Sequence, residues 1–125
     1  MFSLKKSTFL QVKNILSENT SADGNITFDG NTKIDGNITG DIICNGDVVI
    51  GESSTIKGNI TAKSVIISGN VAGNITAEKQ FCLTAEATLT GNVEAASIVI
   101  DEGAEFNGMS KSKKAEISSE KEQEE

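Results

Sequence analysis

The sequence predicts an all-β protein, a parallel β-helix (β-solenoid) in which short strands coil around one apolar core. Three observations predict this fold. Apolar and polar residues alternate through most of residues 21–109, which is the period of a strand with one buried face. Apolar triads recur every 16 or 17 residues, starting at 48, 65, 81 and 98. Gly-Asn pairs recur between the apolar positions, at 58–59, 73–74 and 91–92, and these residues favour tight corners.

Each repeat of about 17 residues would supply three short faces around a triangular core. Residues 21–109 then make roughly five triangular turns, stacked about 4.8 Å apart. Large apolar residues occupy mostly even positions from Ile26 to Ile60, odd positions from Val65 to Val93, and even positions again from Ile98. The parity changes at small residues around 62–64 and 95–96, where we expect the chain to bend.

The start of this region contains the triplet Asp-Gly-Asn three times, at 23–25, 29–31 and 35–37. Asp- and Gly-rich repeats can bind calcium, but the calcium-binding β-roll uses a nine-residue repeat with two glycines. In later repeats the residue before the glycine is Lys57, Ala72 or Thr90, and a metal series would keep its carboxylate. We therefore expect the triplets to form corners, and we expect neither a metal nor a cofactor.

The two ends of the chain differ from its repetitive middle. Residues 110–125 are polar and charged, and they cannot bury enough apolar surface to offset the entropy lost on ordering. We expect a flexible N-terminal arm at 1–20, the β-helix at 21–109 and a disordered tail at 110–125. Residues 22–109 hold 4 lysines against 12 carboxylates, which disfavours nucleic acid as a partner.

The composition argues against an enzyme. The chain has no His, so the commonest general acid-base residue is missing, and it has no Arg, Trp or Tyr. A six-residue beat resembles the hexapeptide-repeat acyltransferases, but that resemblance implies a catalytic His, and the spacing here alternates between six and four. Cys44 and Cys82 match no CxxC pattern and have no His partner. We expect no catalytic residue.

Five related segments carry a family resemblance: Ile34-Asp-Gly-Asn-Ile38-Thr-Gly40, Val48-Val-Ile-Gly51, Ile56-Lys-Gly-Asn-Ile60, Val71-Ala-Gly-Asn-Ile75 and Leu89-Thr-Gly-Asn-Val93. Together with the polar ends, this pattern resembles the bactofilins, which are bacterial polymer-forming cytoskeletal proteins. The resemblance covers about residues 21–109 and implies a right-handed parallel β-helix. It also implies nucleotide-independent assembly into non-polar filaments, joined head to head and tail to tail.

The resemblance further implies a polymerisation-critical phenylalanine near the C-terminal end of the core, and Phe106 is the matching position. Both end turns of a solenoid expose unpaired strand edges and an open core, so an aromatic side chain there suits an interface. The alternative role of Phe106 is to plug the end of the core. Phe28, near the opposite end, is the second candidate for the polymerisation interface.

The middle residues of the four triads form a candidate contact surface. If their neighbours point into the core, these four side chains point outward and stack into one apolar stripe, the outer stripe. Strand propensity on an exposed face is one explanation. A surface that contacts a partner, another filament or the N-terminal arm is the other, and we hypothesise such a cover. The outer stripe consists of Val49, Ile66, Cys82 and Val99.

The N-terminal arm combines apolar and basic side chains. Many bactofilins look similar here, and the resemblance implicates this segment in membrane attachment. Each basic residue contributes about 1 kcal/mol at an anionic surface, which is weak alone but strong when a filament displays many copies. An ordinary disordered tail, or a flap over the outer stripe, is the alternative. The candidate membrane-targeting residues are Met1, Phe2, Ser3, Leu4, Lys5, Lys6, Phe9 and Leu10.

The location and function expected follow from these features. No apolar run approaches the ~20 residues of a spanning helix, and the start lacks the long apolar region of a secretory signal. We expect a cytoplasmic protein, peripheral to the inner face of the cell membrane. Its expected partners are copies of itself, that membrane, and unidentified envelope or motility proteins. We expect a cytoskeletal scaffold for cell-envelope, cell-shape or motility proteins; the alternative is a discrete β-helical binding scaffold that forms no filaments.

Overall fold

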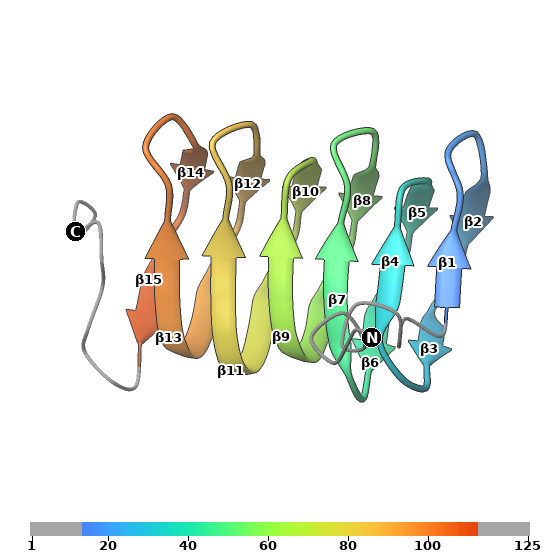
Figure 1. Ribbon diagram of the computed structural model, residues 1–125, viewed down its shortest axis with the longest axis horizontal. Coiled ribbons are helices and arrows are strands. Elements are labelled where there is room, and N and C mark those ends of the chain that lie inside the picture. Colours follow the sequence, from blue (N-terminus) through green and yellow to red (C-terminus); the bar gives the residue numbers. More distant parts are fainter. Residues whose placement is uncertain (1–13, 113–125) are drawn as a thin grey trace, which may run out of the picture.

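The chain folds into a parallel β-helix in the computed structural model, which describes residues 14–112 (Figure 1). This part of the chain consists of strands β1 to β15 and contains no helix. All strand pairs are parallel, and each turn visits three faces before it stacks on the previous turn. Because the second face holds a sheet of six strands, the rod has six turns. The predicted β-helix is confirmed, and the expected five turns are corrected to six.

The strands of the three faces are as follows. The first face holds β1 (Asn14–Leu16), β4 (Thr32–Ile34), β7 (Asp47–Ile50) and the second halves of β9, β11 and β13. The second face holds β2 (Ser21–Asp23), β5 (Asn37–Thr39), β8 (Thr55–Lys57), β10 (Asn70–Ala72), β12 (Thr88–Thr90) and β14 (Glu105–Asn107). The third face holds β3 (Ile26–Phe28), β6 (Ile42–Cys44), β15 (Ser110–Ser112) and the first halves of β9 (Ile60–Ile67), β11 (Ile75–Leu83) and β13 (Val93–Ile100).

The three long strands pass from the third face to the first face without a loop. In β9, Ala62 and Val65 are both buried although an odd number of positions separates them. Strict alternation would turn one of them outward, so the strand bends at Lys63 and Ser64, which are not buried. The change of parity that the sequence shows is this bend.

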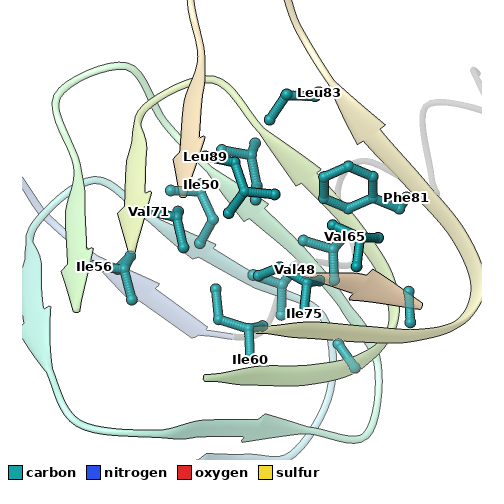
Figure 2. Packing of buried hydrophobic residues seen from close by; sticks show 14 of the residues in the cluster. Val48, Ile50, Ile56, Ile60, Val65, Val71, Ile75, Phe81, Leu83 and Leu89 are labelled. Carbon is teal, nitrogen blue, oxygen red and sulfur yellow. The ribbon is translucent and has the colours of Figure 1, made fainter. Parts of the chain in front are cut away.

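The core is one continuous stack of apolar side chains. Equivalent residues of successive turns lie above one another, as Val48, Val65 and Phe81 do on the first face. Figure 2 shows these side chains pointing towards those of the other faces, such as Ile56 and Val71. Phe81 is fully buried and is the largest such side chain. Burying a side chain of this kind stabilises a fold by about 1.5–3 kcal/mol, so the stack supplies most of the stability of the rod.

The three Asp-Gly-Asn triplets lie at three successive corners, between β2 and β3, between β3 and β4, and between β4 and β5. The six-residue beat is therefore one side of the triangle with its corner. In each triplet the asparagine Oδ1 accepts a hydrogen bond from a backbone N–H of the next turn. These bonds join Asn25 to Asp41 at 3.0 Å, Asn31 to Asp47 at 2.9 Å and Asn37 to Thr55 at 3.2 Å.

The corner between the second and third faces is built the same way in all six turns. A glycine with φ between 109° and 153° occupies it each time, at Gly24, Gly40, Gly58, Gly73, Gly91 and Gly108. A Cβ on Gly58 would collide with the carbonyl oxygen of Gly40 in the turn below, so only glycine fits. The Oδ1 atoms of Asn59 and Asn74 each accept the backbone N–H of the equivalent residue one turn on, at 2.9 and 3.0 Å. We call this series the corner ladder.

The corner between the first and second faces absorbs differences in repeat length. Rungs of the corner ladder are separated by 15 residues in one turn and by 18 in the next. The loop at the first corner has two residues at 35–36 and 68–69, and four at 17–20, 51–54, 84–87 and 101–104. These loops account for two of the three residues by which the two turns differ. The third is an extra residue in β11, where the register with β9 and β13 shifts between Ala77 and Gln80.

The β-helix is longer than the sequence predicted. Strand β1 begins at Asn14, inside the arm expected at 1–20, and β15 ends at Ser112, inside the tail expected at 110–125. Parallel pairing uses backbone groups and does not require apolar side chains. The N–H of Asn14 donates to the carbonyl oxygen of Asn31 at 3.1 Å, and that of Val93 to Met109 at 2.8 Å. The expected boundaries at 21 and 109 were therefore wrong, because apolar pattern alone does not reveal such pairing.

Candidate assembly interfaces

Each end of the rod presents strands with an unpaired edge. At the N-terminal end β1 pairs with β4, β2 with β5 and β3 with β6. At the C-terminal end β14 pairs with β12 and β15 with β13. Among residues 14–112 these end strands have no second partner. A free strand edge offers N–H and C=O groups to another strand, so both ends are candidate surfaces for contact between copies.

Apolar side chains at the N-terminal end are less covered than those of the next turn. Leu16, Ala22, Ile26 and Phe28 pack against the core but remain partly exposed. By contrast Ile42, which lies one rung above Ile26, is fully buried. The four side chains come from all three faces, so the apolar surface spans this whole end of the rod.

The C-terminal end is apolar on two faces and polar on the third. Ile100, Ala104 and Phe106 pack against the core and remain partly exposed. Phe106 lies above Leu89 on the second face, at the end of that column. On the third face the last rung is Ser110 to Ser112, and the Oγ of Ser112 donates to the carbonyl oxygen of Ala96 at 3.1 Å.

The two phenylalanines named from the sequence therefore lie on opposite end turns of the rod, Phe28 on β3 and Phe106 on β14. Sequence reasoning missed the other partly exposed residues of the ends, among them Leu16, Ala22 and Ile100. The strand register could have identified them, because each pairs with a buried core residue of the neighbouring turn. That register becomes visible only once the first and last turns are known to be paired.

The outer stripe lies on the first face, on successive rungs. Val49 pairs with Ile66, Ile66 with Cys82 and Cys82 with Val99. The side chain of Ile66 is 40% exposed, and the other three are half-buried. The same column continues through Lys33 to Ile15, which is 66% exposed and which sequence reasoning missed.

The two thiols have different surroundings. Burial, and after it the negative charge of Asp101, raises the pKa of the Cys82 thiol, so this cysteine is a poorer nucleophile than an exposed one. Cys44 is buried in the core, and its Sγ lies 3.2 Å from the carbonyl oxygen of Gly30. Within residues 14–112, no three His, Cys, Asp or Glu side chains come together as a potential metal site.

The candidate membrane-targeting residues, from Met1 to Leu10, lie outside the described residues. In the part of the chain that the structure describes, no helix has the length and apolarity needed to cross a membrane.

The family model of the polymer-forming cytoskeletal bactofilins matches residues 14–111, almost the whole described β-helix. The chain belongs to the bactofilin family. Its function is therefore that of a polymer-forming cytoskeletal protein, the subunit of a filament-forming homopolymer. None of the curated proteins matches the chain.

Two solved bactofilin structures from Thermus thermophilus are similar to the chain. The cryo-EM reconstruction of its double helical filaments has a TM-score of 0.74 and 29% identity, and covers 78% of this chain and 97% of that one. The crystal structure of a phenylalanine-to-arginine variant has a TM-score of 0.67 and 27% identity, and covers 70% of this chain and 98% of that one. The likeness extends over nearly the full length of both known chains.

Proposed function

We propose that this bactofilin assembles end to end, through both ends of its β-helix, into filaments that form without nucleotide. The observation that carries the proposal is that each end combines unpaired strand edges with apolar side chains that the core leaves partly exposed. A second copy stacked on an end extends the sheets and covers those side chains. These are the same contributions that hold adjacent turns together, so the joint requires no nucleotide.

The difference between the two ends supports non-polar filaments, in which like ends meet. On the third face the N-terminal end presents Ile26 and Phe28, whereas the C-terminal end presents Ser110 and Ser112. A head-to-tail joint would stack these serines on the two apolar side chains. A head-to-head joint instead pairs apolar surface with apolar surface, and each such joint has two-fold symmetry.

The corner ladder supports the same arrangement. Its last rung is Met109, whose N–H donates to Asn92 Oδ1 at 3.1 Å and whose own side chain has no amide oxygen. In a head-to-tail joint the N–H of Asn25 from the next copy would meet Met109 and find no side-chain acceptor. Joints between like ends do not place these two residues together.

We further propose that the filament attaches to the inner face of the cell membrane through Phe2, Leu4, Lys5 and Lys6 of the arm, with Phe9 and Leu10. Avidity supports this role, because weak arms displayed at every subunit add up along a filament. Deleting residues 2–10 is expected to abolish co-sedimentation of filaments with anionic vesicles. Filaments that still sedimented with the vesicles would contradict this assignment.

The finer role that fits a membrane-bound filament is a scaffold for envelope, cell-shape or motility proteins. The competing function is a discrete β-helical binding scaffold. Electron microscopy of the purified chain without nucleotide separates the two, since filaments are expected for the first and compact particles for the second.

Two substitutions test the joints themselves. Phe106→Arg places like charges across the joint between C-terminal ends, so dimers joined at their N-terminal ends are expected; Phe28→Arg is expected to give the converse dimers. The double variant is expected to be monomeric. Sedimentation and negative-stain microscopy measure these states, with Thr76→Arg as the control because Thr76 is exposed on β11, which is flanked by β9 and β13 and is not an end strand. Monomers from either single variant would show head-to-tail joints, and unchanged filaments would refute end-to-end assembly.

A further inference from the structure

The outer stripe is apolar surface that end-to-end joints leave uncovered. Its rungs follow one another along the stacking direction, so a joint at either end of the rod does not bury it. Ile66 at 40% exposure is its most open member, and Ile15 at 66% lies in the same column at the N-terminal end. Lys33 separates Ile15 from the four residues of the stripe. Exposed apolar side chains in such a line gain stability when a partner covers them.

The edge beside the stripe is acidic. The loops at the corner between the first and second faces carry six carboxylates and no lysine, at Glu18, Asp35, Glu52, Glu86, Asp101 and Glu102. Asp35 forms an ion pair with Lys33 of the first face at 2.8 Å, so the other five carry the acidic character of the edge. The charge of Asp101 reaches the stripe, since it contributes to the raised pKa of Cys82. The surface therefore suits a partner that combines apolar side chains with positive charge.

Residues 1–13 of the chain have that composition. They contain no carboxylate, and they combine apolar side chains with Lys5, Lys6 and Lys13. They join the β-helix at Asn14, the first residue of β1, which lies on the same face as the stripe. The arm thus offers the apolar side chains and positive charge that suit the stripe and its acidic edge, and it leaves the rod on the face that carries the stripe.

The arm is also long enough. Ile15 and Cys82 lie four rungs apart, on β1 and β11, which is about 19 Å at ~4.8 Å per rung. The segment from Ser3 to Asn14 spans at most about 36 Å at ~3.3 Å per residue. A tether of this length gives the arm a local concentration on the order of millimolar, so weak contacts are sufficient for docking.

We propose that the N-terminal arm of this chain folds back onto the outer stripe, with its apolar side chains over Ile66 and Val99 and its lysines along the acidic edge. A second filament is the main competing occupant. It would bring further carboxylate-rich edges to a carboxylate-rich face, whereas the arm brings positive charge. The inference does not depend on membrane binding. Where both hold, the stripe and the membrane compete for one segment.

Disulfide trapping in the full chain, without lipid, tests the docking. Ser3→Cys supplies a thiol in the arm, and oxidised glutathione is the oxidant. We expect an intrachain disulfide with Cys82 that forms at least about tenfold faster than in a matched control, from the local concentration of a docked segment. The control carries Cys82→Ser and Thr76→Cys, because Thr76 is exposed on the third-face half of the same strand, across the corner where the arm joins. The raised pKa of Cys82 slows its exchange, so faster trapping there reports proximity.

The remaining outcomes are decisive as well. Adding Lys5→Glu and Lys6→Glu is expected to slow trapping at Cys82 several-fold, and an unchanged rate would overturn the role of the acidic edge. Equal trapping on both faces would overturn docking on the stripe. Disulfides between chains through Cys82 in the unmodified protein would assign the stripe to a second filament.

Discussion

The two halves of the rod turn the corner between the third and first faces in different ways. In the first two turns separate strands meet at a hydrogen-bonded corner, where Asn45 accepts from the N–H of Gly30 and donates to Asp29 Oδ1, both at 2.7 Å. In the next three turns β9, β11 and β13 run through the same corner without any glycine. A hydrogen-bonded corner with a side-chain amide and a bent strand without glycine therefore close the same triangle equally well.

The cores of the two halves differ in the same sense. Thr32 and Phe81 occupy one column of the first face and are both buried. Thr32 Oγ1 donates to the carbonyl oxygen of Gly30 at 3.0 Å and accepts from Asn14 Nδ2 at 3.2 Å. At this column the N-terminal half thus buries a hydroxyl group whose hydrogen bonds are made, whereas the C-terminal half fills the same position with a large apolar side chain.

The largest effect on stability is expected when the buried aromatic side chain of this column is removed. Phe81→Ala should lower the free energy of unfolding by roughly 3–5 kcal/mol, from lost burial and the cavity left behind. Thr32→Val keeps the shape of the column and loses two hydrogen bonds, so a cost of about 1 kcal/mol is expected. Urea denaturation of the Phe28→Arg/Phe106→Arg background measures both without interference from assembly. Equal costs would show that the two halves do not differ as described.

The corner glycines sharpen the comparison between an end and the interior. A Cβ on Gly91 would collide with the carbonyl oxygen of Gly73, whereas a Cβ on Gly24, in the first turn, would meet nothing within 4 Å. Gly24→Ala should cost roughly 1–2 kcal/mol from positive φ alone. Gly91→Ala should cost about 3 kcal/mol because steric overlap is added. Thermal unfolding of the two variants checks the order, and a reversed order would contradict templating of each corner by the turn beneath.

The smallest expected effect concerns the thiol on the outer stripe. Burial, and then Asp101, raises the pKa of Cys82 in the folded chain. A raised acid pKa stabilises the fold below the unfolded pKa, and this contribution is lost as pH rises towards the folded pKa. Asp101→Asn removes only the lesser cause. The midpoint of the alkylation rate against pH should therefore move to lower pH and remain above that of an ordinary thiol. A midpoint that stayed in place would mean that this carboxylate does not act on Cys82.

Much of the fold is legible in the sequence because a solenoid repeats its local chemistry. The parity change near Lys63 and the triplets around Gly24, Gly30 and Gly36 each predict a local bend or corner, and each is found. The sixth turn was missed because the strands at the two ends are held by backbone pairing. Strand β1, which begins at Asn14, pairs with β4, and β15, which ends at Ser112, pairs with β13. Pairing of that kind depends on the turn next to it and leaves no mark in the side-chain pattern.

The candidate sites were predictable to a lesser degree. The outer stripe follows from the alternation of apolar and polar residues. Ile15 could not be assigned to it in this way, because the charged Lys33 lies between Ile15 and Val49 in the same column. The apolar ends required knowledge of which residues lie on the last rungs, as the partial exposure of Leu16 and Ile100 shows. The roles of Phe106, Phe28 and the arm stay predictions, because interfaces are properties of two chains and not of one.

The loops of two and four residues at the first corner separate the length of the chain from the length of the rod. A turn advances by about 4.8 Å whichever loop it carries, so six turns measure roughly 29 Å. Evolution or an engineer can therefore enlarge the loop at 84–87 without altering the subunit's axial pitch. A peptide epitope inserted there would recur along a filament at intervals fixed by the length of the rod. The polymer would then display any chosen peptide at a spacing that does not depend on the length of the insertion.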